Sequence, residues 1–140
     1  MSATGSRTQA GFTLLEALVV VTITAMAGAI MFPRVDRALR ILALRETAAG
    51  LTADLRIARA QAIRAGAPVQ FAVAADGRSY AWTGARARAA PSAILLSSSG
   101  PVTFFGDGSA SGSTLTAAAG NRAARITVDP ATGAAAAAGP

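Results

Sequence analysis

The residue with the clearest chemical potential is Glu16, a carboxylate inside the apolar stretch GFTLLEALVVVTITAMAGAIMF. From Phe12 to Phe32 there is no Lys, Arg, Asp or His, and a helix of this length would cross about 31 Å. An ionised group in hydrocarbon costs about 2.5 kcal/mol or more near the middle of a bilayer. The segment therefore predicts a membrane helix in which Glu16 needs a partner.

The sequence contains no Cys and no His, so few of its side chains could take part in catalysis. Thiol nucleophiles, disulfides, imidazole bases and the commonest zinc ligands are thereby excluded. Ser97, Ser98 and Ser99 have neither a His nor a Lys to act as their base, because every basic residue is Arg. We expect no enzyme activity, no metal site and no cofactor.

Two further motifs are better explained as turns. The segment GDGSASG at 106–112 has the glycines of a phosphate loop, but no Lys follows it and it lies between predicted strands. Asp76, Asp107 and Asp129 fall in three separate turns, without the alternating ligands of a calcium loop. Both patterns favour connections between strands.

Nucleic-acid binding is a weaker possibility. Tyr80 and Trp82 alternate along a predicted strand and share one face, which suits base stacking but suits packing within a sheet better. The net charge is +6, yet the Arg residues are scattered and no block of five or more basic residues occurs. A solvated basic surface is the simpler interpretation.

Three interpretations of the N-terminal segment remain. Arg7, the apolar run and Ala25-Met26-Ala27 fit an ordinary secretory signal, and the run alone fits a plain membrane anchor. Neither explains Glu16. The third takes Gly11-Phe12-Thr13-Leu14-Leu15-Glu16 as one unit, which resembles the class III prepilin signal of type IV pilins and type II secretion pseudopilins.

That resemblance assigns roles to three residues. In this family a membrane peptidase cuts after the glycine, here Gly11, and methylates the new N-terminal residue, here Phe12. Glu16 then becomes the fifth residue of the mature chain, and the resemblance implies that it meets the N-terminal amine of a neighbouring subunit during filament assembly. Two buried charges would neutralise each other.

The C-terminal half indicates which group of pilin-like proteins the chain resembles. VTFFGDGSASGSTLT, followed by RITVDPATG, resembles the globular part of the GspH/FimT group of minor pseudopilins and minor pilins. The resemblance implies a type II secretion pseudopilin of the filament tip, with other minor pseudopilins, the major pseudopilin and the prepilin peptidase as partners. The group often continues with a polar or basic strand after the TG pair, whereas Ala residues follow Gly133 here.

An alternative within the same resemblance is a FimT-like minor pilin that helps a type IV pilus assemble or take up DNA. In that case phosphates would be contacted by basic side chains of the C-terminal half. The candidates are Arg86, Arg88, Arg122 and Arg125.

The elements that would position these residues follow from periodicity. A helix is predicted from about Phe12 to Ala65, with a stop at Gly66-Ala67-Pro68. Pro33 would bend this helix or mark a boundary within it. An apolar stripe favours packing on the chain's own sheet over a coiled-coil seam. It comprises Ile41, Leu44, Ala48, Leu51, Leu55, Ala58 and Ala62, while Arg45, Glu46, Asp54, Arg56, Arg59 and Arg64 lie off it.

After the helix the pattern changes to short strands, which predicts an α+β protein with one long N-terminal helix followed by an antiparallel sheet. The resemblance implies that this arrangement is the type IV pilin-like fold. A hairpin is expected at 69–83, with loops at 84–92 and 106–113 and a tight turn at Gly120-Asn121. The tail GAAAAAGP is expected to be frayed. Further strands are expected at 94–97, 102–105, 114–118 and 124–128.

The predicted organisation has four parts: a leader at 1–11, a transmembrane or filament-core helix at 12–33, its amphipathic continuation at 34–66, and a β domain at 67–140. The resemblance implies an inner-membrane anchor with the β domain in the periplasm. A count of positive charges opposes this, since Arg34, Arg37 and Arg40 follow the span and only Arg7 precedes it. The expectation follows the resemblance, because its motif is more specific.

Overall fold

The computed structural model describes residues 13–138, which form one helix and eight strands. Helix α1 spans Leu14–Ala65, close to the predicted range, and Pro33 lies within it. The helix ends before Gly66, whose φ of 60° is the left-handed conformation that commonly closes a helix. By its contacts the chain divides into two units, one up to Arg37 and one from Ala38 onward.

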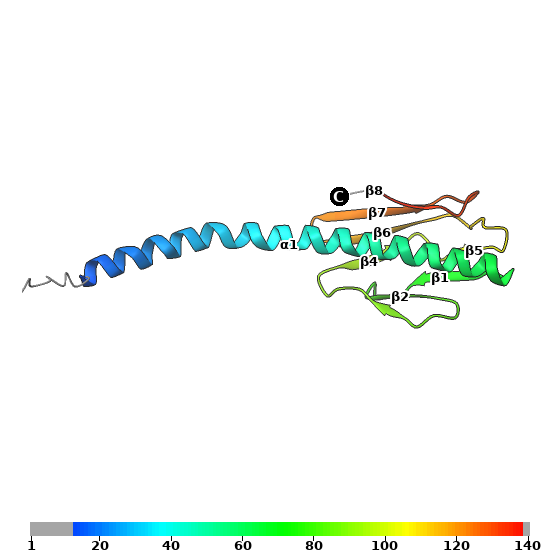
Figure 1. Ribbon diagram of the computed structural model, residues 1–140, viewed down its shortest axis with the longest axis horizontal. Coiled ribbons are helices and arrows are strands. Elements are labelled where there is room, and N and C mark those ends of the chain that lie inside the picture. Colours follow the sequence, from blue (N-terminus) through cyan, green and yellow to red (C-terminus); the bar gives the residue numbers. More distant parts are fainter. Residues whose placement is uncertain (1–12, 139–140) are drawn as a thin grey trace, which may run out of the picture. The chain divides into compact units, whose positions relative to one another are not determined.

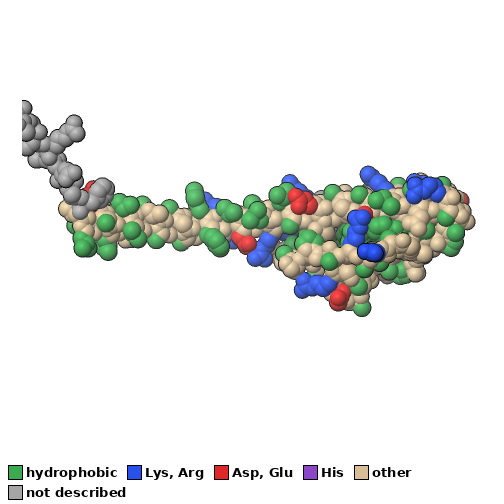
Figure 2. All heavy atoms as spheres, turned by 60° about the horizontal axis from the view of Figure 1, so that its bottom comes forward, with side chains coloured by type: hydrophobic (Ala, Val, Ile, Leu, Met, Phe, Trp, Pro, Cys, Tyr) green, Lys and Arg blue, Asp and Glu red, His purple; other side chains and the backbone are tan. Residues whose placement is uncertain are grey.

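In the first unit, the large apolar side chains of α1 are exposed, from Leu14 (86% exposed) to Phe32 (79%). Figure 2 shows these hydrophobic side chains on the surface of the helix. Within the described part of the chain, α1 is the one helix whose length and composition would let it cross a membrane, with a mean hydropathy of 2.2 over its most apolar window. None of that window is buried, so the segment is chemically suited to lipid or to other helices.

In the second unit, the remainder of α1 packs on two four-stranded antiparallel sheets (Figure 1). The first sheet has the order β3-β2-β1-β5, and the second has the order β4-β6-β7-β8. The strands are β1 (Val69–Val73), β2 (Ser79–Trp82), β3 (Arg88–Ala89), β4 (Leu95–Ser98), β5 (Val102–Phe104), β6 (Ser113–Ala119), β7 (Arg122–Val128) and β8 (Ala135–Ala138).

The core lies between α1 and the inner faces of both sheets. The predicted stripe is buried from Leu44 to Ala62 and only partly at Ile41, so packing on the chain's own sheets is confirmed over the coiled-coil alternative. Strand alternation supplies the other half of the core, as in β7, where every second residue is buried. The largest fully buried side chains are Phe71, Phe104, Leu44, Leu51, Leu55, Ile94, Leu115 and Ile126.

The hairpins agree with the predicted turns. β1 pairs with β2 in register Phe71↔Trp82, and β6 pairs with β7 around Gly120, whose φ is 61°. At the β1–β2 turn, Gly77 has a φ of 66°, and a Cβ there would lie 2.5 Å from the Leu96 carbonyl oxygen. Gly77 is therefore required both by its conformation and by the close approach of β4.

Three sequence expectations were wrong. A single sheet was expected, but β4 and β5, although consecutive, join different sheets: β5 pairs with β1, and β4 pairs with β6. The predicted loop at 84–92 contains β3, which pairs with β2. Within the tail expected to be frayed, residues 135–138 form β8, because their backbone pairs with β7 and needs no large side chain to do so, while residues 139–140 lie outside the described residues.

Candidate assembly site

The first turn of α1 holds the carboxylate singled out above. Thr13 caps the helix: its Oγ1 accepts a hydrogen bond from the Glu16 amide at 3.2 Å, and its carbonyl accepts one from the Ala17 amide at 3.1 Å. A Thr followed three residues later by Glu is the sequence pattern of a capping box. Glu16 thus has a role in its own helix terminus, besides any role in binding a neighbour.

The cleavage and methylation residues, Gly11 and Phe12, lie outside the described residues, so their assignment stays a prediction. Glu16 is exposed and is followed by exposed apolar side chains, including Leu18 and Val19. A carboxylate at the start of an apolar helix surface can bind a cation brought by another molecule.

A buried polar cluster joins α1 to the first sheet. Asp54 is only 2% exposed, and its Oδ2 accepts a hydrogen bond from the Tyr80 hydroxyl at 2.8 Å. The Arg88 guanidinium donates to both Asp54 oxygens, at 2.9 and 3.0 Å. The sequence pattern placed Asp54 off the apolar stripe and gave no sign of its burial; its partners follow it by 26 and 34 positions.

The electrostatics of this cluster favour a protonated phenol. Burial raises the pKa of Tyr80 to about 12, and the adjacent Asp54 carboxylate adds to the effect. Arg88 supplies the opposite charge to Asp54 and itself remains about half exposed. A buried carboxylate with two donors is a stable structural tie.

Tyr80 and Trp82 lie on a packed aromatic face. The Phe71 ring stacks on Tyr80 at 5.4 Å and on Trp82 at 6.0 Å between centroids. Trp82 is 7% exposed and donates through Nε1 to Gln61 Oε1 at 3.2 Å, and the Arg88 guanidinium lies 5.5 Å from its ring centroid. The preference for sheet packing over a base-stacking platform is confirmed.

A second polar tie joins α1 to the Gly-rich loop. Arg59 Nε donates to the Gly108 carbonyl at 2.9 Å, and the Ala110 amide donates to the Pro130 carbonyl at 2.9 Å. Gly133 has a φ of 63°, and a Cβ there would collide with the Gly108 carbonyl oxygen. The loop therefore packs against α1 and the late turn, as a connection rather than a phosphate site.

The acidic turn residues are satisfied locally. The Ser109 hydroxyl and amide donate to Asp107 and lower its pKa, and the Thr132 amide and hydroxyl do the same for Asp129. Within residues 13–138, no group of three or more His, Cys, Asp or Glu residues is placed to hold a metal ion. These aspartates shape turns.

The four arginines considered for phosphate contact fall into two pairs. Arg86 and Arg88 belong to the β2–β3 region of the first sheet, whereas Arg122 and Arg125 lie on β7 of the second sheet. All four are exposed at their surfaces, but Arg88 is bound to Asp54. The sequence alone did not indicate that Arg88, unlike the other three arginines, would bind a buried carboxylate.

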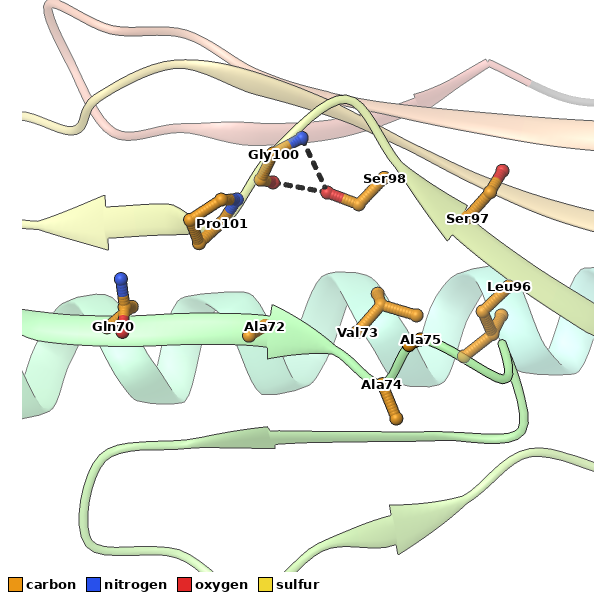
Figure 3. A pocket seen from close by; sticks show the side chains of 10 residues that line it. All are labelled: Gln70, Ala72, Val73, Ala74, Ala75, Leu96, Ser97, Ser98, Gly100 and Pro101. Atoms are coloured by element: carbon orange, nitrogen blue, oxygen red, sulfur yellow. Dashed lines mark hydrogen bonds between the residues drawn. The ribbon is translucent and has the colours of Figure 1, made fainter.

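A cavity of about 450 Å³ is lined by residues from both sheets. Figure 3 shows its lining from β1, the following turn, β4 and the turn into β5, with the Ser98 hydroxyl bonded to the backbone of Gly100. None of its ten lining residues is titratable, so the cavity offers hydrogen bonds and small apolar contacts without acid–base groups.

Comparison with known proteins decides the family. The family model for the prokaryotic N-terminal methylation motif matches residues 6–32. The model for type II transport protein GspH matches residues 47–132, which is more than half of the chain. The chain belongs to the GspH family. A search of curated proteins gave no match.

Solved structures show that this GspH family member has the expected fold. The minor pseudopilin EpsH from the type 2 secretion system of Vibrio cholerae aligns over 69% of this chain and 97% of its own, with a TM-score of 0.60 and 12% identity. The type IV minor pilin FimU of Pseudomonas aeruginosa aligns over 68% of this chain and 92% of its own, with a TM-score of 0.57 and 15% identity. The predicted α+β, pilin-like fold is confirmed.

Proposed function

We propose that this GspH family member is a minor pseudopilin of a type II secretion system, a structural subunit of the filament tip that drives export of folded proteins across the outer membrane. The match of residues 47–132 to type II transport protein GspH is the observation that carries this proposal. The match of residues 6–32 to the N-terminal methylation motif supports the proposal, because subunits of such filaments enter the filament through a segment of this kind. Its work is binding, not catalysis.

Processing is part of the proposal. A prepilin peptidase cuts between Gly11 and Phe12 and methylates Phe12, so residues 1–11 are a leader. Residues 12–33 then anchor the chain before assembly and enter the filament core afterwards. The exposed apolar side chains of α1 suit both environments, since lipid tails and packed helices are both apolar.

Glu16 drives assembly by binding the N-terminal amine of a neighbouring subunit. Its place in the first helical turn supports this role, because the carboxylate lies at the end of the apolar segment rather than in its middle. The partners are the other minor pseudopilins and the major pseudopilin, with the peptidase as a processing partner.

The chain is anchored in the inner membrane by one span, with the amphipathic helix at 34–66 and the predicted β domain at 67–140 in the periplasm. The count of positive charges opposes this orientation, because Arg34, Arg37 and Arg40 follow the span. A reporter fused after Gly139 decides the matter. A reporter that is active only outside the cytoplasm should be active in this fusion. Activity of a reporter that works only in the cytoplasm would refute the proposed topology.

A FimT-like minor pilin is the second candidate, favoured by one observation: the minor pilin FimU aligns nearly as well as EpsH. In that role Arg86, Arg122 and Arg125 are the better phosphate contacts, since Arg88 already binds Asp54. The deciding experiment deletes the gene and measures two outputs, secretion of exoproteins and uptake of DNA. Lost secretion with normal DNA uptake supports the first proposal, and the opposite result supports the second.

A further inference from the structure

Gly50 lies in the interior of α1, and its own fold does not require a glycine there. A Cβ built at Gly50 meets nothing within 4 Å, and its φ is not in the left-handed region. Glycine is among the poorest helix formers, so Ala would serve the isolated chain better. The glycine is explained if another backbone or side chain approaches this part of α1 closely.

A notch adjoins this glycine. It has a volume of about 270 Å³ and lies between α1 and the segment after β3, with Tyr80 among its lining. On the helix side Ala43, Thr47 and Gly50 are all small. Ligand pockets for small molecules are usually larger than this, whereas one apolar side chain needs no more room. The lining residues are Ala43, Glu46, Thr47, Gly50, Tyr80, Ala89, Ala90 and Pro91.

The rim of the notch carries one charge. Glu46 is exposed, and within residues 13–138 it takes part in no hydrogen bond or ion pair. Leu39 and Leu42, 59% and 53% exposed, precede Glu46 and Gly50 at helical steps of three and four, so all four lie on one face. The face therefore combines exposed apolar surface, a small-residue depression and a free carboxylate.

We propose that this notch receives an apolar side chain from a helix of another pilin-like subunit, beside a Lys or Arg of that helix that pairs with Glu46. Gly50 lets the two helices approach closely, because a residue without a Cβ leaves room for a neighbouring backbone. This inference rests on the proposed assembly function, and it assigns to it a contact in the folded unit, separate from Glu16.

The test uses the full chain in membranes of cells that co-express the pilin-like subunits of the same genome. Because the sequence has no Cys, Ala89→Cys places a single thiol at the notch and Val21→Cys a single thiol in the apolar segment for photo-crosslinking. Gly50→Ala should raise Tm by about 4–8 °C. It should also lower crosslinking from the notch by about five- to a hundredfold, as overpacking of a close contact would.

Gly50→Leu and Ala60→Leu form a matched pair, because Ala60 is an exposed α1 residue outside the notch. Only Gly50→Leu should lose the notch crosslink. The inference is overturned if Gly50→Ala lowers Tm, or if both Gly50 variants crosslink like the parent while the Val21 probe still captures a subunit. If the Val21 probe captures no subunit from the parent chain, the assembly function fails and the notch proposal fails with it.

Discussion

The hydroxyl of Tyr80 donates a hydrogen bond to the carboxylate of Asp54 at 2.8 Å, and this contact ties an inner strand of the first sheet to α1. Asp54 is nearly inaccessible to water, so the stability of its charge depends on the donors around it. Arg88 is the other donor and comes from the edge strand β3. One buried carboxylate thereby fixes two strands to the helix.

We predict that Tyr80 ionises only at high pH. It is the single Tyr of the chain, so the ultraviolet absorbance of tyrosinate reports it alone. The folded protein should titrate with a pKa of about 12, and the urea-unfolded chain near 10. Because the folded pKa is the higher one, this contribution to stability is complete below pH 10 and is lost as pH rises from 10 to 12. Equal pKa values in the two states would contradict the buried contact.

Removing Arg88 should destabilise the fold, because it leaves the buried Asp54 carboxylate with only Tyr80 as donor. Arg88→Ala should lower the free energy of unfolding by about 1–3 kcal/mol. Arg86→Ala is the control and should stay within about 0.5 kcal/mol of the parent. The measurement is urea unfolding followed by the fluorescence of Trp82, the single Trp. Equal effects of the two substitutions would mean that the ion pair contributes nothing.

The two β-hairpins offer a matched test of close packing. Gly77 and Gly120 both have positive φ, at 66° and 61°, but only Gly77 has an atom in the way of a Cβ. Gly120→Ala should cost about 1–2 kcal/mol, the penalty of the left-handed backbone. Gly77→Ala adds a collision with the Leu96 carbonyl and should cost distinctly more. Similar unfolding midpoints for both variants would show that β4 yields readily at this point.

The alanine tail should behave as a strand. Ala135 is 7% exposed and belongs to the core, whereas Ala136 faces outward on the same strand. Ala135→Asp buries a charge and should destabilise the protein by about 3 kcal/mol or more, while Ala136→Asp should change it by less than about 0.5 kcal/mol. Urea unfolding compares them, and a tolerated Ala135→Asp would argue that β8 is not held in place.

Local patterns predicted much of this fold. The helix and its buried stripe follow from period, and the turns at Gly77 and Gly120 follow from residues that tolerate positive φ. The division into two sheets did not follow, because pairing joins residues far apart in sequence, such as Val69 with Phe104. β8 was missed for a related reason: its backbone supplies the pairing, and Ala signals no strand by itself.

The candidate site also has one part that the sequence predicts and one part that it does not. The prepilin motif is contiguous, so the sequence names Gly11, Phe12 and Glu16 directly, and their roles stay predictions. The Asp54 cluster is assembled by folding from α1, β2 and β3. A sequence pattern that places Asp54 on the side of an apolar stripe gives no indication that a Tyr and an Arg will meet it there.

Glu16 has two possible roles, and one substitution separates them. In its own helix it lies in the first turn, with its amide bonded to Thr13, a position where Gln serves as well as Glu. Toward a neighbouring subunit only the charged carboxylate can neutralise an N-terminal amine. Glu16→Gln therefore keeps the helix start and removes the assembly charge, while Glu16→Ala removes both side-chain functions.

If the charge drives assembly, Glu16→Gln and Glu16→Ala should both be cut after Gly11 and both fail to assemble. Each entering subunit would bury an unpaired amine, a penalty of about 3 kcal/mol, equivalent to more than about a hundredfold in association. Mass spectrometry of the mature N-terminus measures cutting, and crosslinking to other pseudopilins together with secretion in a deletion strain measures assembly. Full function of Glu16→Gln with loss in Glu16→Ala would assign Glu16 to its own helix terminus, and full function of both would remove it from assembly altogether.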